Sequence, residues 1–350
     1  MPSLRKSLSF NVAYGRLIDS ARALIKTSRP SGHGYRSIRE KLLDRLTDSS
    51  RSARTFGKIL RLYQRSGLQW LARASRILKL FGLAELDANL PSLLPQDAFR
   101  ESYPVQGKPA GHVALFIGCV AGITDRQTLF AAIRLLNRLG YEVHIPSSQV
   151  CCGAMHQHSG RWDHATELMR KNIQAFSADR YDAIIHTASG CGASLSEYAK
   201  YLDNDEAAKR FAHKVKDIGE FLATAAWPPR LSFKPLNRRI AVHDPCTLTH
   251  VLRQQDKPYA LLSKIPGAEI VPLPENHLCC GAAGTYHLTH PEIAGSLRAD
   301  KLAHLKQLAP EILATSNIGC AMYLAAGIRE AGFKIEVVHP VVLLERQLND

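Results

Sequence analysis

Eight cysteines are the residues of this 350-residue sequence whose types and spacing could do chemistry, and all of them lie after residue 118. They form two sets of four in the same order: a single cysteine, an adjacent pair and a last cysteine. The sets are Cys119, Cys151, Cys152 and Cys191, and then Cys246, Cys279, Cys280 and Cys320. Corresponding members lie 127 to 129 residues apart, and each pair begins the same sequence, Cys-Cys-Gly-Ala. This agreement predicts an internal duplication, with one sulfur-rich site in each copy.

Four thiolates around one centre are suited to a zinc ion or to an iron–sulfur cluster. Two adjacent cysteines chelate a single ion poorly, but they can bind different iron atoms of one cluster. We therefore expect all eight cysteines to be metal ligands that hold one or two [4Fe–4S] clusters. Zinc in one repeat is the main alternative, followed by a dithiol switch and by buried free thiols. No catalytic residue is predicted, because the sequence has no nucleophile elbow and no phosphate-binding glycine loop.

Several histidines near the cysteines are candidates for a supporting role. Four that follow the cysteine pairs could complete a site of three cysteines and one histidine: His156, His158, His287 and His290. Their positions after the two pairs do not correspond, so we expect hydrogen-bonding or surface roles for most of them. His243 and Asp244 come just before Cys246 and are expected to tune the second site without binding metal. His112 and His186 lie in apolar runs and are predicted to be core or strand-end residues.

The cysteines follow short apolar runs that alternate with amphipathic helical patterns. Strands are predicted at 113–117, 142–145, 183–186, 240–243, 269–273, 312–315 and 336–338, with helices near 125–139 and 161–176. This alternation is typical of parallel sheets covered by helices. The carboxyl ends of parallel strands meet at one edge of the sheet, and ligands bind at that edge. The four sulfurs of each repeat should therefore converge on one crevice.

The sequence before the first cysteine has a different pattern. Apolar residues recur every three to four positions, which predicts helices around 10–25, 38–46, 56–63 and 68–80, with a Pro- and Gly-containing break at 28–34. Two proline-rich stretches are predicted to be linkers. The expected organisation is a basic helical region at 1–89, a linker at 90–111, a first α/β domain at 112–226, a second linker at 227–237 and a second α/β domain at 238–350.

The net charge of +14 is concentrated in the first third of the chain. Residues 1–110 contain 20 Lys and Arg against 8 Asp and Glu, a net of +12, whereas the rest contains 25 against 23. Such a region favours contact with an acidic protein or an anionic lipid surface. Nucleic acid is not expected as a partner, because aromatic residues are not interleaved with the basic ones. Neither a membrane span nor a secretory signal is predicted, so we expect a cytoplasmic protein, with peripheral contact at the inner membrane face as an option.

The spacing of each set resembles the cysteine-rich CCG domain family: one cysteine, about 32 residues, Cys-Cys-Gly, about 39 residues and a last cysteine. That family includes iron–sulfur subunits of glycolate oxidase, the B subunit of heterodisulfide reductase and lactate-utilisation iron–sulfur proteins. The segments TASGCGAS, HDPCTLTH, HLCCGAAGTYHLTHP and TSNIGC are most similar to the glycolate oxidase type. The resemblance covers about residues 110–350. It implies two tandem, duplicated, Rossmann-like parallel-sheet domains related by pseudo-symmetry, after an α-helical N-terminal region.

The resemblance also implies a function. The chain would be a non-autonomous iron–sulfur subunit of an oxidoreductase, and it would pass on electrons from a FAD-containing 2-hydroxy-acid dehydrogenase subunit that oxidises glycolate or D-lactate. The eight cysteines would then be the cluster ligands, four in each repeat. A heterodisulfide-reductase-like thiol-redox subunit and a zinc-stapled scaffold without catalytic activity are the two alternatives.

Two features depart from the family pattern. Glycolate oxidase iron–sulfur subunits usually carry two ferredoxin-type cysteine motifs before the CCG region, but no cysteine precedes Cys119 here. We therefore expect a truncated start, a lost relay, or a separate ferredoxin-type protein as a further partner. In heterodisulfide reductase each repeat ends in Cys-x-x-Cys, whereas Ser194 and Tyr323 occupy the positions three after Cys191 and Cys320. This difference favours four sulfur ligands in each repeat over five.

Overall fold

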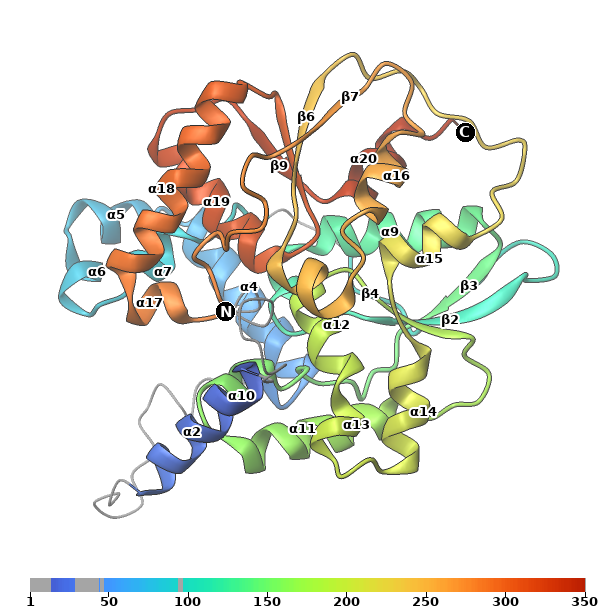
Figure 1. Cartoon of the computed structure of the whole chain (residues 1–350), viewed down its shortest axis with the longest axis horizontal. Coiled ribbons are helices and arrows are strands. Elements are labelled where there is room, and N and C mark those ends of the chain that lie inside the picture. Colours follow the sequence, from blue (N-terminus) through green and yellow to red (C-terminus); the bar gives the residue numbers. More distant parts are fainter. Residues whose placement is uncertain (1–13, 29–43, 45–46, 94–96, 350) are drawn as a thin grey trace.

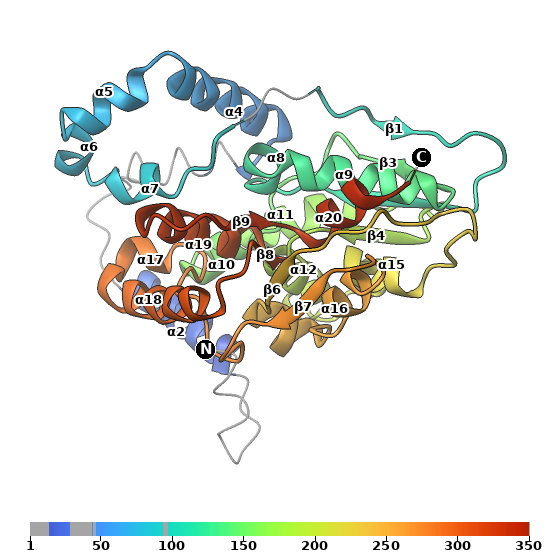
Figure 2. The same cartoon turned by 90° about the horizontal axis from the view of Figure 1, so that it is seen from above.

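The computed structural model describes residues 14–28, 44, 47–93 and 97–349. The predicted helix around 38–46 and the break at 28–34 fall almost entirely outside these residues. The N-terminal region is helical, as predicted. Its elements are α2 (Tyr14–Ser28), α4 (Ser50–Arg65), α5 (Leu68–Ala74), α6 (Ile77–Leu80) and α7 (Ala84–Ala88). Figure 2 shows α4 to α7 as an arm that stands away from the two sheets.

The first repeat is built on a sheet in the order β1-β3-β2-β4-β5. Its strands are β1 (Ser102–Tyr103), β2 (Gly111–Phe116), β3 (Tyr141–His144), β4 (Ala183–His186) and β5 (Val215–Asp217). All pairs are parallel except β1 with β3, and Val113 of β2 pairs with Val143 on one side and Ala183 on the other. The helices are α8 (Ala121–Thr124), α9 (Arg126–Arg138), α10 (Ala154–His158), α11 (Trp162–Ala175), α12 (Ser189–Ser196), α13 (Tyr198–Tyr201), α14 (Glu206–Lys214) and α15 (Ile218–Thr224).

The second repeat has a fully parallel sheet in the order β7-β6-β8-β9. Its strands are β6 (Arg239–His243), β7 (Glu269–Pro272), β8 (Ile312–Thr315) and β9 (Glu336–Val338). The helical elements are η1 (Leu248–Leu252), α16 (Lys257–Leu262), α17 (Tyr286–Thr289), α18 (Pro291–Leu308), α19 (Ile318–Glu330) and α20 (Pro340–Gln347). The order β7-β6-β8-β9 repeats β3-β2-β4-β5, so the fold confirms the predicted duplicated α/β architecture.

The two repeats share one apolar core where they meet. Helix α9 of the first repeat packs on α20 of the second, and α15 packs on α16. Because α9 corresponds to α16 and α15 to α20, these two contacts are related by the pseudo-symmetry of the duplication. Leu129 and Ile133 of α9 lie in the same buried cluster as Val341 and Leu344 of α20. The repeats are therefore joined through their helices, side by side in Figure 1, with their sheets on opposite sides of this layer.

Within the described residues, no helix has the length and apolar character needed to cross a membrane.

Candidate metal centres

The first four cysteines come together at the carboxyl edge of the first sheet. Cys119 lies three residues after β2, the pair Cys151–Cys152 lies in the loop between β3 and α10, and Cys191 lies in the first turn of α12. The sulfur atoms of Cys119 and Cys151 are 3.2 Å apart. Hydrogen bonds between thiols continue from Cys151 to Cys152 and from Cys152 to Cys191. The four sulfurs therefore form one continuous group.

The second set repeats this arrangement at the edge of the second sheet. Thiol hydrogen bonds join Cys246 to Cys279, Cys279 to Cys280 and Cys280 to Cys320. The order of contacts is the same as in the first repeat, member for member. Two thiols of each tetrad are fully buried and two are half-buried. The structure thus brings together all the predicted site residues, as two separate sulfur tetrads.

A positive backbone angle explains the glycine that follows each cysteine pair. Gly153 has φ +86° and Gly281 has φ +92°, values at which any side chain is strained. A Cβ atom at Gly153 would lie 3.2 Å from the carbonyl oxygen of Ala165, and one at Gly281 would lie 2.4 Å from that of Ala294. The backbone of each pair is therefore held against a helix, which turns both sulfurs toward the tetrad.

An amide side chain in each repeat ties two segments of the tetrad together. Gln149, just before the first pair, accepts a hydrogen bond from the Ile117 backbone N–H at 2.8 Å and donates to the Leu115 carbonyl at 3.2 Å. Asn276 holds the corresponding position in the second repeat: it accepts from the Asp244 N–H at 3.1 Å and donates to the Val242 carbonyl at 2.8 Å. The sequence analysis missed both residues.

The grouping of thiols favours one thiolate in each tetrad. Hydrogen bonds from the thiols of Cys151 and Cys191 lower the pKa of Cys152 well below its ordinary value. In the second tetrad, hydrogen bonds from Cys246 and Cys280 lower the pKa of Cys279 to about 2. Thiolates are the form that binds metal, and neighbouring thiols lose their protons when a cation enters such a site. This donor set fits a thiophilic metal or an iron–sulfur cluster.

Neutral groups support the pair in the first repeat. Tyr198 and Ser194 donate hydrogen bonds from their hydroxyls to the Cys152 carbonyl oxygen, at 2.9 and 3.1 Å. Asn172 donates to the Cys151 carbonyl oxygen at 2.8 Å and accepts from the Val150 N–H at 3.0 Å. Ser194, which stands where heterodisulfide reductase has a further cysteine, is therefore engaged in holding the backbone.

A buried cation occupies the corresponding place in the second repeat. Lys301 is only 2% exposed, and its ammonium donates a hydrogen bond to the Glu275 carbonyl at 2.6 Å. It corresponds to Asn172, because each residue lies seven positions after the alanine against which the CCG glycine packs. Burial lowers the pKa of Lys301, but the charge of Cys280 acts against that shift. The sequence analysis missed this lysine, although it lies on the same helix face as the buried Ala294 and Leu305.

One histidine approaches each tetrad, but from a different strand. In the second repeat a ring nitrogen of His243, at the end of β6, lies within 4.8 Å of the sulfurs of Cys280 and Cys320. Nδ1 of His243 is 2.9 Å from the Thr315 hydroxyl. In the first repeat the ring of His186, at the end of β4, lies over Gly192, where a Cβ atom would be 2.0 Å from its ring carbon.

The other predicted histidines make contacts of their own. Nε2 of His156 is 2.9 Å from the Thr47 hydroxyl, and His158 pairs with Asp19 at 3.1 Å. Nδ1 of His287 is 3.0 Å from the Ala282 carbonyl oxygen, while His290 stacks on Tyr286. The His–Cys group found among the described residues contains His243 alone. Asp244, also predicted to act near the second site, accepts hydrogen bonds from Tyr259 and Asn276.

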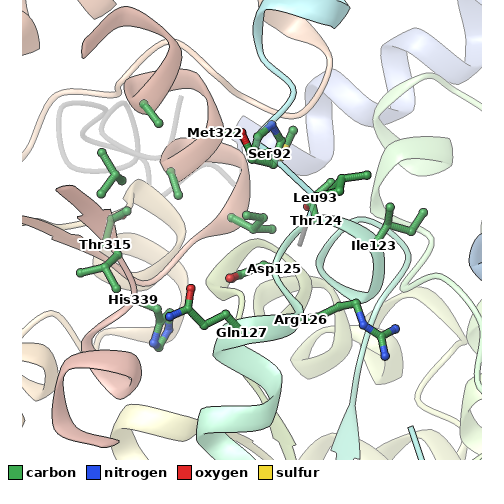
Figure 3. Close-up of a pocket in the computed structure, with 16 residues that line it drawn as sticks. Ser92, Leu93, Ile123, Thr124, Asp125, Arg126, Gln127, Thr315, Met322 and His339 are labelled. Atoms are coloured by element: carbon green, nitrogen blue, oxygen red, sulfur yellow. The ribbon is translucent and has the colours of Figure 1, made fainter. Parts of the chain in front are cut away.

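A cavity of about 190 Å³ lies between the repeats, beside the second tetrad. Figure 3 shows Asp125, Arg126 and Gln127 of the first repeat facing Thr315 and His339 of the second across it. Burial raises the pKa of Asp125 to about 6. Thr315 contacts His243 as well as the cavity, so this cavity reaches the surroundings of the second tetrad.

Comparisons with known proteins agree with this geometry. The cysteine-rich CCG domain matches residues 113–196 and 240–325, and the linker region of glycolate oxidase iron–sulfur subunits matches residues 35–90. A crystal structure of a hypothetical protein from Helicobacter pylori shares the fold, with a TM-score of 0.52 at 12% identity over 77% of this chain and 53% of that one.

Sequence relatives carry the same names. The probable glycolate oxidase iron–sulfur subunit of Bacillus subtilis is 32% identical over 344 residues, which cover 95% of this chain and 78% of that protein. The Escherichia coli glycolate oxidase iron–sulfur subunit is 35% identical over 65% of this chain, which spans 57% of its length. Lactate utilization protein A of Geobacillus thermodenitrificans is 30% identical over 67% of this chain and 99% of its own length.

The duplicated sulfur tetrads, the matched linker and these relatives lead to one assignment: the chain belongs to the family of glycolate oxidase iron–sulfur subunits with paired cysteine-rich CCG domains.

Proposed function

We propose that this chain is the electron-transfer subunit of a 2-hydroxy-acid dehydrogenase complex and holds one [4Fe–4S] cluster in each repeat. The observation that carries the proposal is the pair of sulfur tetrads with the same order of contacts. Cys119, Cys151, Cys152 and Cys191 would bind the first cluster, and Cys246, Cys279, Cys280 and Cys320 the second. When bound, such clusters supply one-electron transfer.

The chain itself contributes binding, burial and polarity to this role. The cysteine pairs are held by the CCG glycines and by Gln149 and Asn276, so the sulfurs are already in place before metal enters. Half-burial of the outer cysteines leaves each site close to the surface, where a partner can approach. Preorganised ligands with limited access to water favour electron transfer over hydrolytic chemistry.

The partner that supplies electrons would be a FAD-containing subunit that oxidises glycolate or D-lactate. Two relatives named as subunits of glycolate oxidase support this choice, and so does a relative from Methanothermobacter marburgensis that is named as one subunit of a fumarate reductase. Each of these names implies a further subunit in the same complex. A separate ferredoxin-type protein is a candidate for the next carrier.

The test is to purify the full chain without oxygen and to mix it with the candidate flavoprotein. We expect about four irons and four sulfides in each repeat, and bleaching of the visible cluster absorption when glycolate or D-lactate is added. A colourless protein that contains zinc would select the scaffold alternative and overturn the proposal. Cluster-dependent reduction of a disulfide without response to the reduced flavoprotein would select the thiol-redox alternative.

A further inference from the structure

The arm formed by residues 50–88 has its apolar side chains on the outside. Of the fourteen large hydrophobic side chains that are exposed in the described residues, ten belong to this arm. They are Ile59, Leu62, Leu68, Trp70, Leu71, Ile77, Leu80, Phe81, Leu83 and Leu86. Trp70 is 70% exposed and Leu80 is 82% exposed, although monomeric proteins rarely leave such side chains grouped in water.

The inside of the arm is polar. Tyr63, Gln69 and Arg73 donate hydrogen bonds to the carboxylate of Asp87 at 3.1, 2.9 and 2.5 Å, and that carboxylate is buried. Helices α5 and α6 contain no buried residue at all. The arm is thus folded around a charged centre, with its apolar groups turned outward, which is the reverse of a water-soluble domain.

The attachment of the arm to the body leaves this apolar surface uncovered. Gly57 of α4 packs on Ile123 of α8, with a Cβ position 3.3 Å from that side chain. Ile59 lies on the opposite side of the same helix and is 59% exposed. At the other end of the arm, Arg329 of α19 donates a hydrogen bond to the Ala88 carbonyl at 2.8 Å. Figure 2 shows α5 and α6 as the part that extends farthest from the sheets.

The charge of the arm has one sign. From Ser49 to Ala84 the sequence has no Asp or Glu, but it has eight basic residues: Arg51, Arg54, Lys58, Arg61, Arg65, Arg73, Arg76 and Lys79. Lys58, Arg65, Arg76 and Lys79 are exposed. Long basic side chains can place their stems on apolar surface and their charges at a phosphate layer, and tryptophan prefers the same boundary.

We propose that the arm binds the surface of an anionic lipid bilayer, with its outward apolar residues among the acyl chains and its cations at the phosphate groups. Charge complementarity selects lipid over an apolar protein groove, because a groove would leave most of these cations without an anionic partner. The attachment would be interfacial, since the arm has no helix that could span a membrane. This proposal does not depend on the metal content of the tetrads.

The experiment measures binding of the full chain to vesicles of phosphatidylcholine alone and of phosphatidylcholine with phosphatidylglycerol in equal parts. We expect co-sedimentation with the anionic vesicles only, together with a blue shift of tryptophan emission that is lost in Trp70→Phe. Each cation contributes about a factor of five, so Lys58→Gln/Arg65→Gln/Lys79→Gln should lower the partition coefficient about 100-fold. Trp70→Ser/Leu80→Ser should lower it about ten-fold or more.

Matched controls come from the rest of the chain. Ile293→Ser removes an exposed apolar side chain of α18 that is 56% exposed, and Lys209→Gln/Lys306→Gln/Lys334→Gln removes three exposed cations outside the arm. Both controls should bind like the unaltered chain. All these positions are exposed, so unfolding temperatures should not change. Absence of vesicle binding, equal binding to neutral vesicles, or equal losses in the controls would overturn the proposal; the first of these results would indicate a protein partner instead.

Discussion

The two repeats hold the same sulfurs in different surroundings. Strand order, contact order and the CCG glycine are the same in both. Around the sulfurs, however, Phe116 of the first repeat corresponds to His243 of the second, and Asn172 corresponds to Lys301. A buried ammonium therefore lies near the second pair, while neutral amide and hydroxyl groups lie near the first. Duplication has kept the metal-binding geometry, and later changes have altered the local charge.

This contrast predicts two centres with different reduction potentials. A bound cluster gains negative charge when it is reduced, and a nearby buried cation stabilises that charge. The second centre should therefore be reduced first.

The largest test of this comparison removes one sulfur from either tetrad. Cys151→Ser and Cys279→Ser should each abolish one centre and leave the other, so that each variant loses about half of the iron. Iron and sulfide analysis measures the loss, and electron paramagnetic resonance identifies which signal disappears. The double variant should contain no cluster. Loss of both centres from one substitution would contradict the independence of the two tetrads.

The glycine of each CCG sequence gives the next test. Gly281→Ala and Gly153→Ala both place a side chain at positive φ, which costs about 1–2 kcal/mol. The clash with the helix carbonyl is closer at Gly281, 2.4 Å against 3.2 Å, so Gly281→Ala should be the more destabilising. Thermal unfolding of the metal-free chain measures this difference without interference from cluster loss. Equal unfolding temperatures for the two variants would mean that the backbone of the second pair is free to move.

Substitution of the buried lysine tests the electrostatic difference directly. A unit charge at roughly 7 Å in a medium of dielectric constant about 20 is worth about 2 kcal/mol, or on the order of 100 mV for a one-electron couple. Lys301→Met should lower the potential of the second centre by about this amount and leave the first unchanged. Lys306→Met, an exposed position on the same helix, is the control. A potentiometric titration followed by electron paramagnetic resonance gives both values.

The smallest expected effect belongs to the histidine. Burial lowers the pKa of His243 to about 3, so its ring is neutral at pH 7 and acts only as a dipole. His243→Phe introduces the residue of the first repeat and should move the second potential by on the order of tens of mV, less than Lys301→Met. The same titration measures it. A shift larger than that of Lys301→Met would show that the imidazole binds the metal.

Local patterns in the sequence were sufficient for the duplication, the α/β fold and the eight sulfurs. Apolar runs ending near 116, 186, 243 and 315 predicted strands that the structure places at β2, β4, β6 and β8. The edge strands β1 and β5 were not predicted, because two or three residues are too few for a period of two to appear. The cysteine sets could be recognised because their spacing repeats along the chain.

What lies around those sulfurs depended on the tertiary structure. His186 lies over Gly192, Lys301 reaches the Glu275 carbonyl and Gln149 bridges to Leu115, and each of these contacts joins segments from separate elements. The outward apolar surface of the arm also needed coordinates, since a helical period does not tell which face meets the body. Sequence periodicity fixes what a segment can bury on its own, whereas the partners of a polar or exposed group are set by packing between distant segments.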